Sequence, residues 1–452
     1  MAERILVVGG NAAGMTAASR AKRLDPALRI TILESGRFIS YSICGLPYAL
    51  TGEVGRHEDL VAFTPQALKE ERGLEARLRV QVQEILPGRR VILCRHLEAE
   101  GEFELEYDRL VLATGYVPRL PRIEGTGLEG VFTVSRLEHG IAIGERLRQG
   151  QARRAAVVGG GYIGLMMAQA LRTRGLEVLL LERNRHLYNQ VDDEIALEIE
   201  QELGRQGVEL LLGTAVHSLR GSQGRLEAVE AGGKLHAVDL ALLDVGVAPH
   251  TELARGSGIP CGMSGAVEVD ERGQTLACGI YAAGNCAETR HLVTGRPIFS
   301  ALGTTAAKQG RVVGENLAGR RSIFAGSLET SLEKVFGLSV ARTGLTLRQA
   351  LQSGFEADAV TIKARDRAAY YPGSDSIKVR LVFENRGGRL LGGQILGGDL
   401  AAKRIDTLVA ALTAKMSLQD LSQLDLAYAP PYATLWDPIQ VAANVGLRKL
   451  RR

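Results

Sequence analysis

Cysteine, tryptophan and long apolar runs are scarce in this sequence of 452 residues. The five cysteines are an odd number and include no CxxC pair: Cys44, Cys94, Cys261, Cys278 and Cys286. This usage excludes a disulfide framework and a cysteine-based zinc site, so we expect no bound metal. A cysteine with a chemical role must therefore be identified by its sequence neighbours.

An excess of charge of one sign is also lacking, since 55 basic and 51 acidic residues leave a formal charge of +4. Such a balance argues against nucleic acid as the main partner. The longest uncharged stretch, residues 155–171, is interrupted by four glycines, which is typical of a strand, turn and helix rather than a membrane span. The start at Met1 runs directly into an apolar segment, so we expect no signal peptide and a cytoplasmic protein without a membrane partner.

A strand, glycine turn and helix pattern begins the chain. The apolar residues 5–8 precede the sequence GGNAAG at 9–14 and an expected helix over 15–24. In such a unit Gly9 permits a tight turn, Gly14 lets helix and strand approach, and the helix N-terminus faces a pyrophosphate. Glu34 ends the next apolar run, about 20 residues after the glycines, where a carboxylate accepts ribose hydroxyls.

The same pattern returns at residues 155–182. Here the glycine turn is GGGYIG at 159–164, with Gly159, Gly161 and Gly164 in the three glycine positions, and the following apolar run ends in Glu182. Two copies predict two dinucleotide sites, and the simplest use of two is hydride transfer between two cofactors. Glu182 favours NADH because its charge repels a 2′-phosphate, whereas the neighbouring Arg183 and Arg185 leave NADPH open.

Later segments complete the predicted organisation. The apolar stretches 239–246 and 275–285 each end at a glycine turn, and we expect both as strands that return to the first unit. Between 377 and 384 apolar and polar residues alternate, which predicts an antiparallel sheet with one wet face. A helix with Leu408, Val409 and Leu412 on one side follows, which gives a third, α+β domain.

Cys44 stands apart from the other cysteines because it lies in FISYSICGLPY at 38–48, just beyond Glu34 and thus close to the first cofactor. If a helix starts there, its free N–H groups lower the pKa of the thiol. No second cysteine lies four or five residues away, so the oxidised form must be a mixed disulfide, a persulfide or a sulfenic acid. We interpret the other four cysteines as small apolar residues.

Taken together, these motifs resemble the pyridine-nucleotide disulfide oxidoreductases over the whole chain, in the single-cysteine branch that holds coenzyme A disulfide reductases, persulfide reductases and NADH oxidases. The motifs that carry the resemblance are GGNAAG at 9–14, SYSICGLPY at 40–48, LATG at 112–115, GGGYIG at 159–164, YAAGNCAE at 281–288, LGTTAAKQGR at 302–311, YYPG at 370–373, KRID at 403–406 and YAPPY at 428–432.

The resemblance implies an α/β fold of two Rossmann-like domains plus a C-terminal α+β dimerisation domain. The FAD-binding domain comprises residues 1–115 and 250–325, the NAD(P)H-binding domain 116–249, and the dimerisation domain 326–452. Thr114, Gly115 and Asn285 join the glycines as FAD-binding residues, although Asn285 stands where relatives carry aspartate. Met166 likewise replaces a glutamate near the nicotinamide pocket.

The resemblance also implies a homodimer whose site is built by two chains. Tyr370 or Tyr371 and Tyr428 reach the cysteine of the partner chain, with plain packing in an interface as the other interpretation. The residues that fall where coenzyme A reductases hold their ligand are Thr16, Arg20, Arg23, Ser40 and Arg72. Ile43 and Trp436 replace an asparagine and a lysine of those enzymes, which leaves a smaller persulfide, polysulfide or disulfide open as substrate.

We therefore predict an FAD-dependent NAD(P)H oxidoreductase that reduces a disulfide, persulfide or polysulfide through Cys44. Two alternatives remain open at this point. One is an NADH oxidase or peroxidase in which Cys44 cycles through a sulfenic acid. The other is a flavin-binding redox sensor without turnover, which the departures at Asn285 and Met166 make conceivable.

Overall fold

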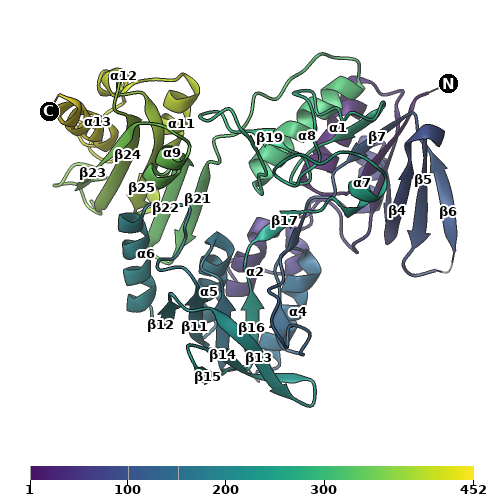
Figure 1. The fold of residues 1–452 in the computed structure, drawn as a ribbon, viewed down its shortest axis with the longest axis horizontal. Coiled ribbons are helices and arrows are strands. Elements are labelled where there is room, and N and C mark those ends of the chain that lie inside the picture. The colour runs from purple at the N-terminus through teal and green to yellow at the C-terminus, as the bar shows by residue number, and fades with distance from the viewer. Residues whose placement is uncertain (1, 100, 151, 452) are drawn as a thin grey trace.

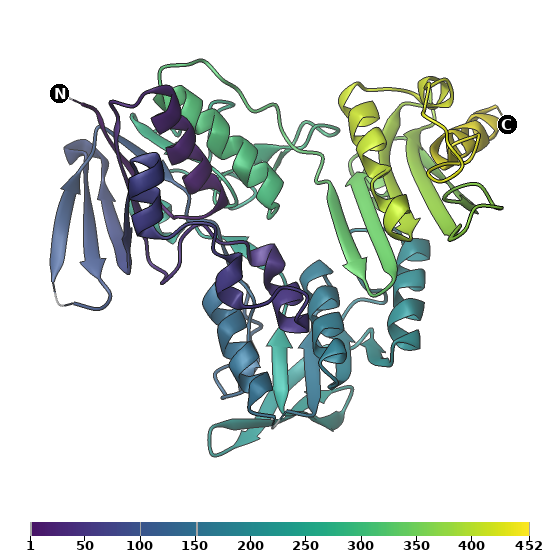
Figure 2. The same cartoon turned by 180° about the vertical axis from the view of Figure 1, so that it is seen from behind.

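The computed structural model describes residues 2–99, 101–150 and 152–451. Figure 1 shows three bodies, with the N-terminus on the first and the C-terminus at the far end of the third, and Figure 2 shows them from behind. Within these residues no helix has the length and apolar character needed to cross a bilayer. The predicted α/β class with a separate C-terminal α+β domain is confirmed.

The first body is built on a parallel sheet in the order β18-β7-β1-β2-β3. Ile5 and Val7 of the central strand are fully buried, because helices and a second sheet cover the two faces of a parallel sheet. The strands are β1 (Arg4–Val8), β2 (Arg29–Glu34), β3 (Glu75–Leu78), β7 (Arg109–Leu112) and β18 (Ile280–Ala282). The helices are α1 (Ala12–Leu24), α3 (Pro65–Arg72), α7 (Glu252–Gly256) and α8 (Gly303–Leu317).

Helices α1 and α8 lie side by side in close contact, as both views show. Two glycines of α8 permit this approach. A Cβ at Gly310 would stand 2.3 Å from the carbonyl oxygen of Ala13, and one at Gly314 would stand 2.5 Å from that of Ala17. The glycines of α8 therefore allow close packing against α1, which brings polar side chains of the two helices within reach of each other.

The second body repeats this architecture with the sheet order β12-β11-β10-β16-β9. Its strands are β9 (Val131–Phe132), β10 (Arg154–Val158), β11 (Glu177–Glu182), β12 (Val208–Leu212) and β16 (Leu240–Leu243), and its helices are α4 (Leu137–Arg148), α5 (Tyr162–Thr173) and α6 (Asp193–Arg205). The expectation that 239–246 returns to the first unit is wrong. Leu240 instead pairs with Ala155 in β10, because β10 offers β16 a neighbouring parallel edge within its own sheet.

Smaller sheets lie around these two bodies. They are a three-stranded sheet of β4 (Val80–Leu86), β5 (Val91–His96) and β6 (Glu102–Glu106), another of β13 (Val216–Ser222), β14 (Arg225–Ala231) and β15 (Lys234–Ala237), and pairs β8 (Tyr116–Pro118) with β17 (Val247–Pro249) and β19 (Thr289–Arg290) with β20 (Pro297–Ile298). The ribbon of β8 and β17 runs where the chain passes from the first body to the second and back. The predicted domain boundaries near 115 and 250 fall beside it and stay a prediction.

The segment after Glu34 connects the two nucleotide-type bodies. It contains the short helices η1 (Ile43–Gly45), α2 (Leu46–Thr51) and η2 (His57–Leu60), and another short turn is η3 (Pro87–Arg89). Leu46 and Leu50 of α2 are buried in one cluster with Leu165 and Met167 of α5. This segment therefore belongs to the first body by sequence and to the core of the second by packing.

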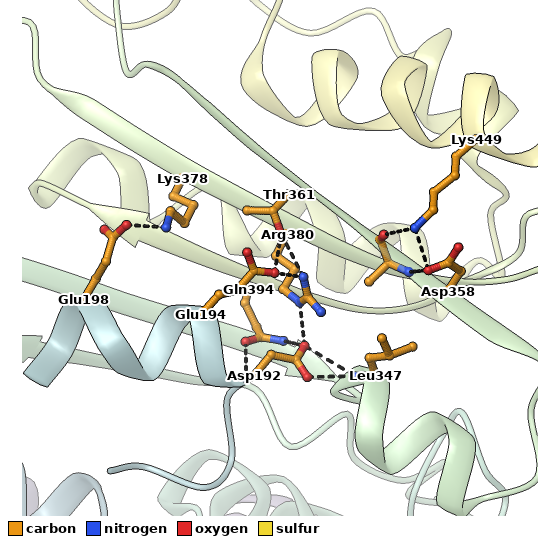
Figure 3. A network of polar contacts seen from close by, with 11 residues as sticks. Asp192, Glu194, Glu198, Leu347, Asp358, Thr361, Lys378, Arg380, Gln394 and Lys449 are labelled. Carbon is orange, nitrogen blue, oxygen red and sulfur yellow. Dashed lines mark hydrogen bonds and ion pairs between the residues drawn. The ribbon is translucent and has the colours of Figure 1, made fainter. Parts of the chain in front are cut away.

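The third body is an antiparallel sheet in the order β21-β22-β25-β24-β23. Its strands are β21 (Ser331–Val335), β22 (Leu338–Gly344), β23 (Ala357–Arg365), β24 (Ser376–Glu384) and β25 (Leu390–Gly397). Its helices are α9 (Leu347–Gln352), α10 (Asp399–Ala402), α11 (Ile405–Thr413), α12 (Leu418–Ser422) and α13 (Pro438–Leu450). A polar network shown in Figure 3 joins α6 of the second body to this sheet.

Candidate functional site

The first glycine turn has the shape of a pyrophosphate cradle. Gly9 has a φ of +108°, and a Cβ there would lie 2.2 Å from the carbonyl oxygen of Ala113. At Gly14 a Cβ would lie 2.0 Å from the oxygen of Gly9. No described side chain caps the start of α1, and its first turn carries no acidic residue. These features fit FAD, because the open N–H groups and positive end of α1 suit its pyrophosphate.

Glu34 ends β2 beside this turn. Its carboxylate accepts hydrogen bonds from the backbone N–H groups of Gly10 at 2.9 Å and Gly36 at 2.7 Å. These contacts hold the carboxylate at the mouth of the turn, where lone pairs remain for ribose hydroxyls. The predicted arrangement of glycines and acid is thus present in the structure.

The other residues predicted to bind FAD lie at the ends of β7 and β18. Thr114 donates a hydrogen bond to the carbonyl oxygen of His250 at 2.6 Å, and Gly115 has a φ of +74°. The Asn285 amide donates to the carbonyl oxygen of Ser300 at 2.7 Å. This leaves the side-chain oxygen of Asn285 as the acceptor that the usual aspartate would supply.

The second turn has the same geometry. A Cβ at Gly159 would lie 1.9 Å from the oxygen of Asp244, and one at Gly164 would lie 2.0 Å from that of Gly159. Gly161 is the residue that precedes α5, and Glu182 accepts a hydrogen bond from the N–H of Gly160 at 2.8 Å. The second turn therefore suits a second dinucleotide.

Asp244 is a residue of this turn that the sequence did not reveal. Its carboxylate accepts a hydrogen bond from the N–H of Gly164 at 2.8 Å. Burial raises the pKa of Asp244 to about 6, against the lowering effect of that hydrogen bond, and the nearby Glu182 raises it further. A short acidic residue after a buried strand is a weak signal, so only the fold places it under the glycines.

Cys44 lies in the turn η1, immediately before α2. Its side chain is exposed on one side, yet the protein atoms packed around the sulfur raise the pKa of the thiol, and its own backbone N–H opposes this only in part. The expected lowering of the pKa by a helix N-terminus is therefore absent. The physical reason is that desolvation of the thiolate outweighs the N–H groups of so short a turn.

A groove of about 670 Å³ leads to Cys44. Its lining includes Asn11 and Ala12 at the start of α1 and the apolar side chains of Ile43 and Phe63. All five residues predicted to hold a substrate line it as well, namely Thr16, Arg20, Arg23, Ser40 and Arg72. The structure thus brings the predicted cysteine and the predicted ligand contacts into one groove.

The charge of the groove has one sign. Four arginines line it, Arg311 being the one that the sequence did not reveal, and the lining among the described residues includes no Asp or Glu. Arg72 lies with its guanidinium 4.2 Å from the centre of the Phe63 ring and donates to Ser19 at 3.2 Å. Such planar cations suit phosphate or carboxylate groups.

The predicted tyrosines lie on the third body and do not line this groove. Tyr370 and Tyr428 are 77% and 45% exposed, and a hydrogen bond between their hydroxyl groups raises the pKa of Tyr370. Tyr371 lies beside them and is 37% exposed. The structure therefore brings the tyrosines together with each other, but away from the cysteine of their own chain.

Arg404 holds the two loops that carry these tyrosines. Its guanidinium pairs with Asp437 at 2.9 Å and donates to the carbonyl oxygens of Asp366 and Tyr432 at 2.7 and 2.9 Å. The loops form an exposed aromatic surface together with Tyr432, Leu435 and Trp436. A patch of this kind marks an interaction surface.

The five cysteines differ in surroundings, and all are free thiols. Cys94 and Cys286 are buried, and the Cys286 sulfur lies 3.4 Å from the oxygen of Leu112. Cys278 is exposed like Cys44, but only Cys44 lines the groove. Across residues 2–99, 101–150 and 152–451, no cluster of three His, Cys, Asp or Glu side chains is arranged to hold a metal ion.

Residues 3–310 match the profile of the pyridine nucleotide-disulphide oxidoreductases, and residues 333–438 match that of their dimerisation domain. The chain belongs to this family. As a pyridine nucleotide-disulphide oxidoreductase it is an NAD(P)H-dependent flavoenzyme, and its cofactors are FAD and NAD(P)H.

Several relatives of this oxidoreductase carry names that describe their reactions. It is 37% identical over 441 residues to an NAD(P)H sulfur oxidoreductase (CoA-dependent) of Pyrococcus abyssi, which covers 98% of this chain and 97% of the relative. It is 35% identical to an NADH oxidase of Methanocaldococcus jannaschii over 99% of both chains. The solved structure of an NAD-dependent persulfide reductase from A. fulgidus has 36% identity and a TM-score of 0.95, over 99% of this chain and 83% of that one.

Proposed function

We propose that this oxidoreductase uses NAD(P)H to reduce a disulfide, persulfide or polysulfide, with Cys44 as the sulfur that meets the substrate. The observation that carries the proposal is the arginine-lined groove whose lining includes the exposed thiol of Cys44. The relatives named for sulfur and persulfide reduction support it. We further propose NADH as the preferred donor.

In this mechanism the Cys44 thiolate attacks one sulfur of the bound substrate R–S–S–R′. The sulfur–sulfur bond breaks, Cys44 forms a mixed disulfide with RS, and R′S⁻ leaves and takes up a proton. Gly9, Gly14 and Glu34 would hold FAD, which would supply the two electrons of NAD(P)H, and with these electrons the mixed disulfide would return to the Cys44 thiolate and RS⁻ would leave. For a persulfide donor the same exchange leaves a Cys44 persulfide, and its reduction releases sulfide.

Side chains of the chain itself assist this exchange in defined ways. The arginines of the groove bind anionic groups of the substrate and orient its sulfur toward Cys44. Ile43 and Phe63 exclude water beside the thiol and favour an apolar arm of the substrate. Because protein packing raises the pKa of Cys44, any group that stabilises its thiolate increases the reactive fraction at neutral pH.

We infer further that the working form is a homodimer, in which Tyr370, Tyr371 and Tyr428 complete the site of the partner chain. The exposed aromatic surface on the third body and its match to a dimerisation domain support this. A tyrosine hydroxyl that donates a hydrogen bond to the leaving thiolate would ease its departure. A free redox thiol suits a reducing compartment, so we place the enzyme in the cytoplasm.

The decisive experiment compares wild type, Cys44→Ser and Cys278→Ser, each loaded with FAD and reduced by NADH without oxygen. We expect coenzyme A disulfide, persulfide or polysulfide to reoxidise wild type and Cys278→Ser, and Cys44→Ser to lose on the order of a hundredfold or more in turnover. Equal turnover by Cys44→Ser would remove the thiol from the mechanism.

The relatives named NADH oxidase make oxygen the second candidate acceptor. The same reduced protein is therefore mixed with air and with peroxide. Rapid reoxidation by either one, with none by sulfur compounds, would replace the reductase proposal by an oxidase or peroxidase. Reduction by neither NADH nor NADPH would favour a redox sensor without turnover.

A subunit-mixing experiment tests the two-chain site. Cys44→Ser and the double variant Tyr370→Phe and Tyr428→Phe are each expected to be impaired as homodimers. In a mixed dimer one of the two sites would regain both the cysteine and the tyrosines, so activity should rise above the mean of the two homodimers. Activity equal to that mean would contradict a site shared between chains.

A further inference from the structure

The four arginines of the groove are held in different ways. Arg72 rests on Phe63 and Ser19, whereas Arg23 has no hydrogen-bond partner among the described residues. Arg20 of α1 and Arg311 of α8 both bind one carboxylate, that of Glu315. Arg20 and Arg311 are thus held together by the same carboxylate.

The hydrogen bonds to Glu315 use only some of the nitrogens of these two arginines. Arg20 donates from Nε at 2.9 Å and from Nη2 at 2.6 Å to Oε1 of Glu315, and Arg311 donates from Nε at 3.1 Å to the same oxygen. The other oxygen of Glu315 accepts from Ser322 at 2.5 Å. Within the described chain, Nη1 of Arg20 and both Nη atoms of Arg311 have no hydrogen-bond partner, so three nitrogens remain for a ligand.

Glu315 and Arg311 differ in how much of the side chain is exposed to solvent. Glu315 is 9% exposed, whereas the Arg311 side chain is 64% exposed and lines the groove. The hydrogen bond from Ser322 and those from the two arginines lower the pKa of Glu315 to about 2. The carboxylate is therefore charged at neutral pH.

The close packing of α1 and α8 makes this arrangement possible. Gly310 and Gly314 bring the two helices together, and Glu315 is the next residue on α8. Two arginine cations that approach one ligand repel each other, and a fixed carboxylate between them offsets that repulsion. It also orders two flexible side chains before any ligand arrives, which lowers the cost of binding.

We propose that Arg311 is an additional substrate-binding residue and that Glu315 is a positioning residue, which holds Arg20 and Arg311 as a clamp for a phosphate group of the sulfur carrier. The inference rests on the proposed function, because it takes the groove to be the path of the substrate to Cys44. It narrows the substrate class to thiols that carry phosphates, in preference to inorganic polysulfide or a small uncharged disulfide. Two guanidinium groups side by side match the several oxygens of a phosphate.

The test compares two disulfides with the same reactive arm. Coenzyme A disulfide carries phosphates, and pantethine is the disulfide of the same arm without them. We expect the ratio of kcat/KM for coenzyme A disulfide to kcat/KM for pantethine to fall about tenfold in Glu315→Gln and in Arg311→Ala, as for the loss of a charged hydrogen bond. The fall should lie in KM rather than in kcat.

Glu230→Gln is the matched control. Glu230 accepts from Ser218 at 2.6 Å and from Arg220 at 2.9 Å, so it repeats the surroundings of Glu315 on the small sheet of the second body. Its ratio should equal that of wild type. An unchanged ratio in both groove variants, or an equal loss for both disulfides in Glu315→Gln, would overturn the clamp.

Direct binding separates this inference from the proposed function. If wild type reduces neither disulfide, the proposed function fails, and calorimetric titration with coenzyme A and pantetheine still tests the clamp. Tighter binding of coenzyme A that Glu315→Gln weakens about tenfold would support the clamp without the chemistry. Equal affinities for the two thiols in wild type would refute it.

Discussion

Single residues in this enzyme owe their chemistry to burial as much as to residue type. Cys44 and Cys286 both have a raised pKa caused first by burial, yet only Cys44 is exposed at a groove. Cys286 is enclosed, with its sulfur against two carbonyl oxygens. The sequence neighbours of the two cysteines predicted that Cys44 is the one in a special position, and the structure places Cys44 alone in the groove. The expected lowering of its pKa was wrong in direction.

His291 is a second single residue whose pKa is shifted by burial, and its effect on stability can be measured. It is 5% exposed, its Nδ1 accepts from the N–H of Val293 at 3.2 Å, and burial lowers its pKa from 6.5 to about 4. The unfolded chain therefore takes up a proton first as the pH falls, so stability is lost between pH 6.5 and about 4. We expect this loss to reach roughly 3 kcal/mol at most.

The variant His291→Asn keeps an acceptor for the N–H group but does not titrate. Its free energy of unfolding should depend less on pH than that of wild type between pH 6.5 and 4, measured by urea denaturation at several pH values. Parallel curves for the two proteins would show that His291 is not the group responsible.

At the scale of elements, the glycine turns were predictable because each needs glycine at fixed positions between a strand and a helix. Gly9 and Gly159 both have positive φ, and both would clash with backbone if they carried a Cβ. Residues that act across elements were not predictable. Arg311 and Glu315 lie about 295 positions from Arg20, and only the contact of α1 with α8 reveals their partnership.

Asp244 follows β16 and accepts a hydrogen bond from the N–H of Gly164 in α5, so it too acts between elements that lie far apart in the sequence. Its pKa of about 6 exceeds the ordinary value, so the folded state binds its proton more tightly than the unfolded state. The stabilising effect is complete below about pH 4 and is lost as the pH rises through 6. Asp244→Asn should therefore raise the free energy of unfolding at pH 7.5 by up to roughly 3 kcal/mol.

The same variant should match wild type below about pH 4, and its amide oxygen can still accept from Gly164. Chemical denaturation at pH 7.5 and 4 measures both points. Because a negative charge beneath the second turn opposes a pyrophosphate, we also expect Asp244→Asn to bind NADH more tightly. A less stable variant at pH 7.5 would mean that the hydrogen bond to Gly164 outweighs the burial of charge.

At the scale of the whole molecule, the third body is fixed to the second by the polar network of Figure 3. Arg380 of β24 pairs with Asp192 at 2.7 Å and with Glu194, while Gln394 donates to Asp192 at 2.7 Å. Arg380 is also 2.8 Å from Thr361. The alternation in β24 predicted the sheet, but nothing in the sequence told which of its polar residues would face another body.

Removal of one partner from this network should be costly. Asp192→Ala removes the shared acceptor of Arg380 and Gln394 while Glu194 still pairs with Arg380, so we expect a loss of about 2 kcal/mol, the cost of buried donors left without a partner. Thermal unfolding followed by circular dichroism measures the loss. Asp358→Ala removes the exposed pair with Lys449 and serves as control, with an expected change of less than about 1 kcal/mol.

The position of α2 has a consequence for motion. This helix follows Cys44 directly, and its leucines are buried beside α5, whose first turn follows the second glycine turn. Any rotation of the second body against the first would carry Cys44 along with the second glycine turn. Because the groove lined by Cys44 also contains Arg20 and Arg23 of the first body, such a rotation would change the width of the groove, and the joint between the two bodies thus sets how far the groove opens.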